Sequence, residues 1–234
     1  GLPDTARPKP PTIKSEYREA AQTRFAELNL EPGRTVVLFP YTGTAPRFGA
    51  SFWSDLTSTL TQEGFQVTTN MSVSASRKRS RLVGDHEKGR PPMAEGSVAI
   101  GLSLEEMLGF VEIAGNVIAA ASGICDLLAF SNSHKLFMFP CKRQDTPPFD
   151  LDLSICLGGA SGGGSLRRCY GARDCEEHNV VLDEAFDRSL LDRWLLTPEE
   201  RTRHDIEERL YKLDVERAKL LTDLDSMEAC ASSG

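Results

Sequence analysis

Long apolar runs are missing from this 234-residue sequence. No stretch approaches the roughly 18 consecutive apolar residues that a membrane-spanning helix needs, so we expect no membrane span. Residues 1–4 show no charged head followed by an apolar run, so we expect no signal peptide. The formal net charge of -7 argues against binding of nucleic acid through the overall field of the protein. Together these absences favour a cytoplasmic globular protein.

Signatures of metal binding and of common catalytic sites are also scarce. The six cysteines show no CxxC spacing, and we interpret them as reduced thiols, with a disulfide or a metal site as the alternative. The sequence has no GxSxG and no HExxH motif, so a hydrolase is the least favoured function. We therefore expect neither a metal ion nor a cofactor. The cysteines are Cys125, Cys141, Cys156, Cys169, Cys175 and Cys230.

What the sequence does contain is an alternation of helical and strand patterns. Apolar residues recur every three or four positions in the helical segments and form short continuous runs in the strands. Continuous apolar strands are typical of the interior of a parallel sheet. The alternation predicts a Rossmann-like α/β fold, a three-layer sandwich with a mainly parallel sheet. The expected helices are 13–28, 51–64, 104–113 and 125–130, and the expected strands are 35–39, 65–70, 116–120, 134–139 and 151–157.

Composition, rather than periodicity, characterises the segments between these elements. Residues 1–12 are rich in proline and indicate an N-terminal tail. Residues 71–99 are polar and rich in Gly and Pro, and we interpret them as an exposed loop that contains a basic cluster at 77–81. The Gly/Ser tract at 158–165 lacks the Lys-Ser/Thr end of a Walker phosphate loop and indicates a flexible loop.

A heptad pattern predicts a long C-terminal helix within 197–234, which leaves 13–196 as the Rossmann-like domain. The apolar positions are spaced alternately by four and three residues, with one charged position among them. About three heptads are marginal for an isolated coiled coil. The pattern therefore leaves three possibilities: packing on the domain, packing on a second Rossmann-like half, or self-association through the 206–227 helix. The positions are Ile206, Leu210, Leu213, Arg217, Leu220, Leu224 and Met227.

Two segments are candidates for a binding site, because ligands bind open α/β sheets beyond the carboxyl ends of the strands. After strand 116–120, the turn formed by Ser122 and Gly123 leads into a helix with Asp126 in its first turn. The amides of a first helical turn carry partial positive charge and suit a pyrophosphate, although a serine and an acid there also fit plain capping. The other segment, after strand 35–39, offers hydroxyls, a glycine and a cation. Its candidate residues are Thr42, Gly43, Thr44 and Arg47, ahead of Ser51 as the expected cap of the next helix.

These segments resemble the C-terminal, donor-binding half of bacterial GT-B glycosyltransferases. The resemblance is to the heptosyltransferase-like branch linked to lipopolysaccharide and capsule assembly, and it covers residues 13–140. It lies in the Pro-ended strand with its hydroxyl-rich loop, in the segment 52–70, and in the Ser-Gly turn and helix at 122–130. It implies a nucleotide-sugar donor whose diphosphate is held by that loop and turn without a metal. Family members often have arginine where this chain has Ala121, and GT-B enzymes use two Rossmann-like halves, of which this chain has room for one.

Two functions follow from these observations, and they leave open whether the chain is an enzyme. The first is the nucleotide-sugar-binding domain of a glycosyltransferase in cell-surface polysaccharide assembly. In it, the amides after Ser122 stabilise the departing diphosphate. The catalytic base is not identified, since Asp126 is the one carboxylate in the site segments and suits helix capping better. The second is a non-catalytic interaction module that keeps the fold and binds a partner subunit, which Ala121 and the single half favour.

Overall fold

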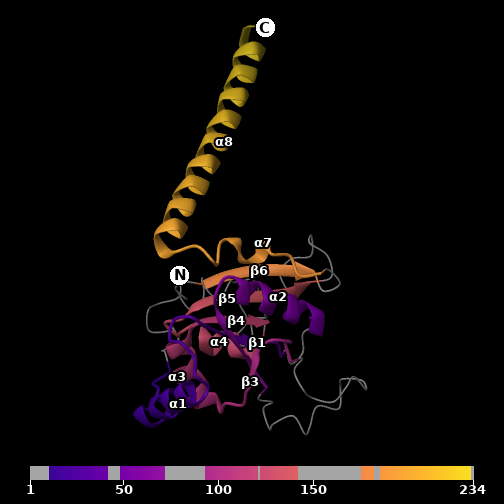
Figure 1. Cartoon of the computed structure of the whole chain (residues 1–234). Coiled ribbons are helices and arrows are strands. Elements are labelled where there is room, and N and C mark those ends of the chain that lie inside the picture. The colour runs from indigo at the N-terminus through magenta and orange to yellow at the C-terminus, as the bar shows by residue number, and fades with distance from the viewer. Residues whose placement is uncertain are drawn as a thin grey trace, which may run out of the picture. The chain divides into compact units, whose positions relative to one another are not determined.

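The chain is described here by a computed structural model that covers residues 11–41, 48–71, 93–120, 122–141, 175–181 and 185–232 (Figure 1). It divides into two compact units, Gly1–Arg188 and Ser189–Gly234.

The helices of the first unit are α1 (Ser15–Glu27), α2 (Ala50–Gln62), α3 (Leu104–Ala114) and α4 (Gly123–Leu128). Its strands are β1 (Thr35–Phe39), β2 (Gln66–Asn70), β3 (Val98–Ile100), β4 (Gly115–Ala120), β5 (His134–Cys141) and β6 (Cys175–Val181). The second unit holds α7 (Ser189–Asp192) and α8 (Pro198–Ser232). None of the helices in the covered ranges is both long enough and apolar enough to cross a membrane.

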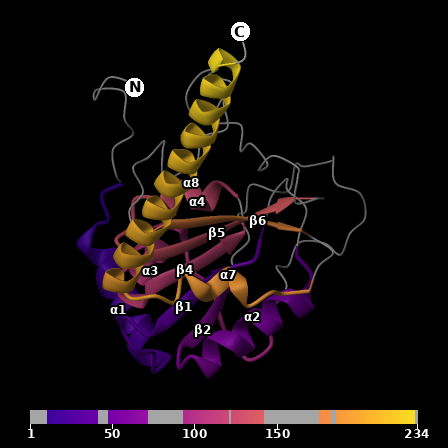
Figure 2. The ribbon, with the colours of Figure 1, turned by 90° about the horizontal axis from the view of Figure 1, so that it is seen from above.

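A six-stranded sheet forms the centre of the first unit, and every pair of neighbouring strands in it is parallel. The strand order is β3-β2-β1-β4-β5-β6, which is the doubly wound order of a dinucleotide-binding fold. The strands β2, β1, β4 and β5 can be followed across the sheet in Figure 2. The prediction of a Rossmann-like α/β fold with a parallel sheet and a long C-terminal helix is therefore confirmed.

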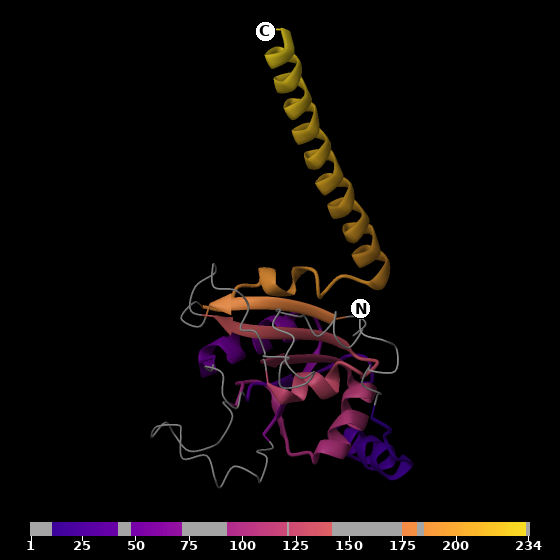
Figure 3. The same ribbon diagram turned by 180° about the vertical axis from the view of Figure 1, so that it is seen from behind.

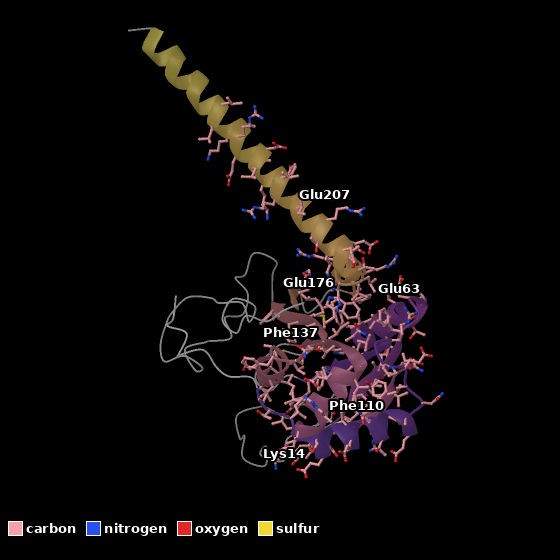
Figure 4. The ribbon with its side chains drawn as sticks, turned by 90° about the vertical axis from the view of Figure 1, so that its left-hand side faces the viewer. Lys14, Glu63, Phe110, Phe137, Glu176 and Glu207 are labelled. Atoms are coloured by element: carbon pink, nitrogen blue, oxygen red, sulfur yellow. The ribbon has the colours of Figure 1, made fainter. Side chains whose placement is uncertain are left out.

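Helices cover both faces of the sheet. On one face, α1, α3 and α4 enclose a core that includes the odd-numbered residues of the central strands, such as Val37 and Phe137 (Figure 3). Phe110 of α3 belongs to the same core, and Figure 4 shows it inside the unit together with Phe137. Because strand side chains alternate, the even-numbered residues such as Leu38 point to the opposite face. That face is covered by α2, whose buried Trp53 and Leu56 lie outside the first core.

The sequence does not predict two strands, and both lie at edges of the sheet. β3 falls inside the segment interpreted as a loop, because only Ile100 of its three residues is buried and the apolar run is too short to recognise. β6 reads Cys-Glu-Glu-His-Asn-Val-Val, and its polar start hides the strand. An edge strand has a neighbour on one side only, so it does not need the continuous apolar run of a central parallel strand.

Pro140 is predicted to end its strand, but β5 continues to Cys141. The partners of β5 on the β4 side end at Met138, whereas its pairing with β6 continues through Pro140. Proline is tolerated there because it lies beyond the last residue of the β4 ladder, so its missing amide proton leaves that ladder intact. The expected strand 151–157, the Gly/Ser tract 158–165 and the basic cluster 77–81 lie outside the described residues.

A capping box opens α8. The backbone N–H of Glu200 donates to Thr197 Oγ1 at 3.3 Å, and the backbone N–H of Thr197 donates to the Glu200 carboxylate at 2.8 Å. The second of these bonds is the main reason why the pKa of Glu200 lies below its ordinary value, since it stabilises the charged form. The prediction of a helix over 198–227 is confirmed, and the helix extends to Ser232.

Acidification is expected to fray the first turn of α8. A carboxylate whose pKa is lowered in the folded state contributes stability above its unfolded pKa, and that contribution is lost as the pH falls through the lower folded value. For Glu200 the loss begins below about pH 4.5. Far-UV circular dichroism between pH 7 and pH 3 should show a smaller loss of helical signal in Glu200→Gln, whose amide keeps its protonation. Equal losses in the two proteins would exclude a role for this carboxylate.

Candidate functional site

The crevice between β1 and β4 is the point where the chain changes direction across the sheet. From β1 the chain proceeds to β2 and β3 on one side, and from β4 it proceeds to β5 and β6 on the other. The connections after β1 and β4 therefore leave from neighbouring strands toward opposite faces, and such a switch point is where doubly wound folds bind ligands. Both segments singled out in the sequence follow these two strands.

The first segment leads from β1 into α2. The structure describes Tyr41 at its beginning and Phe48 at its end, and α2 starts at the N-cap Gly49. The sequence-based choice of Ser51 as the cap is wrong, because Gly49 has the extended backbone of a cap (φ -65°, ψ 163°) while Ser51 is already helical. Four predicted site residues lie outside the described residues: Thr42, Gly43, Thr44 and Arg47.

The amino end of α2 is uncapped and carries no negative charge. Gly49 supplies no side-chain hydrogen bond to the first turn, and that turn contains no acidic residue. A helix of 13 residues that begins in this way carries a partial positive charge at its start, and among the described residues no capping side chain engages its first backbone N–H groups. Gly49 and Ala50 at this start are exposed. This arrangement suits a phosphate group.

The start of α3, which also follows a parallel strand, is closed by its own side chains. The backbone N–H of Glu106 donates to Ser103 Oγ at 3.2 Å, and the N–H of Ser103 donates to the Glu106 carboxylate at 2.9 Å. Glu105 adds a second acid to this first turn. The pattern Ser103-Leu104-Glu105-Glu106 predicts a capping box from sequence alone, and these two bonds confirm it. The capping box makes α3 unsuitable for an anion.

The second segment places Ser122 and Gly123 at the start of α4. Ser122 is the N-cap, in extended backbone (φ -162°, ψ 170°), and its side chain makes no capping hydrogen bond. A Cβ built on Gly123 meets nothing within 4 Å among the described atoms. A ligand can therefore approach the backbone at Gly123 without displacing any part of the described structure, as close binding of a pyrophosphate requires.

The partial positive charge at the start of α4 is smaller than the charge at the start of α2. α4 has six residues, and Asp126 in its first turn offsets the positive charge there. Asp126 is also engaged in an interaction of its own. Reasoning from sequence therefore missed the difference between the two helix starts, since α2 is longer and has no acid in its first turn. The signal was the absence of an acid in the first turn after Gly49, and the hydroxyl of Ser51 obscured it.

Aromatic packing fixes the amino end of α2 in place. The rings of Phe48 and Phe52 stack with their centroids 4.6 Å apart. Trp53 packs edge-on against them, with centroid distances of 6.0 Å to Phe48 and 5.7 Å to Phe52. Phe186 adds an edge contact to Phe52 at 5.5 Å. This aromatic cluster therefore holds the first turn of α2, with its backbone amides, in a fixed position.

The placement of the described side chains gives no indication of a metal or cofactor site. In the parts of the chain with described coordinates, no group of three or more His, Cys, Asp or Glu side chains is arranged to hold a metal ion. Cys125 is buried, and its Sγ donates a hydrogen bond to the carbonyl oxygen of Ala120 at 3.6 Å. The groups described at the crevice are therefore backbone amides and hydroxyls, which hold anions through hydrogen bonds.

Comparison with solved structures finds glycosyltransferases. The chain is similar to E. coli ADP-heptose lps heptosyltransferase II, at 15% identity and a TM-score of 0.46, over 91% of this chain and 56% of that one. The glycosyl transferase family 9 structure from Veillonella parvula DSM 2008 matches at 12% identity and a TM-score of 0.47, over 77% and 45% of the two chains. E. coli heptosyltransferase WaaC with ADP matches at 14% identity and a TM-score of 0.41, over 80% and 48%.

Two of the three structures are heptosyltransferases, and the third is a glycosyl transferase of family 9. The chain spans about half the length of these structures. No family model matches the sequence, and no curated protein does. The fold itself is established by the strand order and the parallel register.

Proposed function

We propose that the chain is the nucleotide-sugar-binding domain of a GT-B-type glycosyltransferase that acts in cell-surface polysaccharide assembly. Residues 13–196 form the binding domain, and the diphosphate of the donor lies in the crevice between β1 and β4. The observation that carries the proposal is the uncapped, acid-free start of α2 at the end of β1, next to the strand whose own end opens at Gly123. The sugar part of the proposal rests on the sequence resemblance.

Glycosyl transfer breaks the bond between the anomeric carbon of the sugar and the diphosphate, and negative charge grows on the leaving group. Amides fixed at the start of α2 and α4 stabilise that charge most strongly when it is fully developed, which lowers the barrier. The hydroxyl of Ser122 adds a donor, and the loop containing Thr42, Thr44 and Arg47 adds hydroxyls and a cation. The acceptor hydroxyl must lose its proton to a base. A second Rossmann-like half supplies that base, because Asp126 already has an interaction at the start of α4.

A thermal-shift screen of nucleoside diphosphates and nucleotide sugars tests the proposal. A ligand that binds the native state at about 100 times its Kd stabilises it by about 2.7 kcal/mol, so a raised Tm is expected for at least one base. Inorganic pyrophosphate serves as the control ligand and should give a smaller shift at equal concentration. A flat screen would instead favour the interaction module that binds a partner subunit.

Variants at the two helix starts separate binding from folding. Gly123→Val adds a side chain into open space, so it should leave the unliganded Tm nearly unchanged and abolish the ligand shift. Gly49→Asp supplies a favourable N-cap and should raise the unliganded Tm slightly while its charge weakens diphosphate binding. Ser122→Ala should weaken binding modestly. Ala26→Val, on the exposed face of α1, is the matched control and should leave the shift intact. A full ligand shift in both glycine variants would place the ligand elsewhere.

A further inference from the structure

An apolar stripe runs along α8, a single continuous helix of 35 residues (Figure 2). Side chains project outward from the helix around Glu207 (Figure 4). The apolar residues of the stripe are between 53% and 67% exposed, which leaves most of their surface in water. These residues are Ile206, Leu210, Leu213 and Leu220.

The stripe follows the core positions of a heptad repeat. Ile206, Leu213 and Leu220 occupy d positions, and Leu210 and Arg217 occupy a positions. The sequence continues the repeat with a leucine at 224 and a methionine at 227. The preceding d and a positions hold Glu199 and Arg203, so the apolar repeat begins at Ile206. Apolar residues at successive a and d positions have the geometry of a coiled-coil seam, and the exposed Leu221 lies beside this seam at an e position.

Charged residues flank the stripe and have no ion pair within the described chain. Arg209 and Glu216 occupy g positions, Asp214 occupies an e position, and Arg217 lies in the stripe itself. No ion pair of the described side chains engages these four residues. The e and g positions are where coiled-coil helices select their partner through charge.

We propose that two copies of the chain pair through residues 206–227 of α8 as a parallel, in-register, two-stranded coiled coil. In that register a g residue faces the e residue five positions later in the other copy, which places Arg209 opposite Asp214 of the partner subunit. Arg217 enters a hole bordered by Glu216 of the partner subunit. Because a twofold axis relates the copies, each contact occurs twice and four opposite-charge pairs surround the middle of the seam.

The charges also select the orientation and the register. An antiparallel pair would bring e positions together, and two of them, Glu207 and Asp214, are acidic and would repel. A single charged a position favours two strands in one register at a cost in stability, which is the effect expected of Arg217. The result is a dimer that forms and dissociates with concentration.

Sedimentation equilibrium of the full chain over a wide concentration range tests the proposal. The mass should rise from 25.7 kDa toward twice that value as concentration increases. Leu213→Asp places a charge in the seam and should weaken association by about 100-fold or more. Val215→Asp adds the same charge at an exposed position off the stripe and should change association by less than about threefold. A monomer at every concentration, or equal effects of the two variants, would overturn the proposal.

A charge-swap series tests the orientation. Arg209→Asp and Asp214→Arg each place like charges across the seam, so each alone should weaken association about tenfold. The double variant restores opposite charges only in the parallel, in-register pair and should regain the association of the unaltered chain. Absence of this rescue would overturn the parallel register.

Discussion

Trp53→Ala is expected to lower the free energy of unfolding by about 4 kcal/mol, the cost of removing a fully buried large ring. Trp53 is 0% exposed, belongs to the buried face of α2, and packs edge-on against the rings of Phe48 and Phe52. Its loss leaves a cavity under the helix that supports the proposed diphosphate site. Chemical denaturation at 25 °C measures the change, and ligand binding should weaken in the same variant because α2 is no longer rigidly held.

Trp53→Phe provides the matched comparison. Among the described side chains, the indole N–H of Trp53 is buried and has no hydrogen-bond partner. Phenylalanine removes that unsatisfied donor while it keeps most of the ring contacts, so it should cost only about 1 kcal/mol. If phenylalanine costs as much as alanine, then the indole nitrogen is bonded and its role in fixing α2 is polar.

Gly109→Val is expected to lower the free energy of unfolding by about 3 kcal/mol. A Cβ at Gly109 would lie 3.2 Å from the carbonyl oxygen of Tyr17 and 3.3 Å from the Cβ of Ala21, so α1 and α3 meet at this point without room for a side chain. Valine adds two further methyl groups, and α1 must move away from the core. The same method measures the change.

Two further substitutions serve as comparisons for Gly109→Val. Gly109→Ala adds two tight contacts but gains helix propensity of about 1 kcal/mol, so its net effect should stay within about 1 kcal/mol. Gly123→Val makes the same chemical change at a position where an added Cβ meets no described atom within 4 Å, and it should be nearly neutral. A neutral Gly109→Val would mean that α1 does not pack tightly on α3.

Local sequence patterns predicted the parts of the fold that local interactions determine. The apolar run of β1 and the capping box at Ser103 can be recognised without knowing their neighbours, and both are confirmed. β3 and β6 depend on pairing with strands distant in sequence, so their short or polar sequences gave no signal. The same distinction applies to Pro140, because its tolerance depends on where β4 stops.

The sequence predicts where the candidate site lies, but it does not predict which of the two helix starts carries more positive charge. The turn at Ser122 and Gly123 can be read from the residues, since a buried strand gives way to a helix there. The role of α2 in the candidate site depends on two facts that the spacing of residues in the sequence does not reveal. One is that β4, and not β3, lies beside β1, and the other is that Gly49 rather than Ser51 caps the helix. Both follow from the arrangement of the whole sheet.

The two edge strands of the sheet, β3 and β6, have features that discourage the protein from forming fibrous aggregates. Exposed strand edges offer unpaired backbone groups to other molecules, and short or charged edges discourage such addition. Among the described strands, β3 has three residues, and the first residue of β6 is followed by two glutamates that would repel a second copy aligned beside it. Repeated addition of strands from other copies is thus disfavoured at both edges of the sheet, even at high protein concentration.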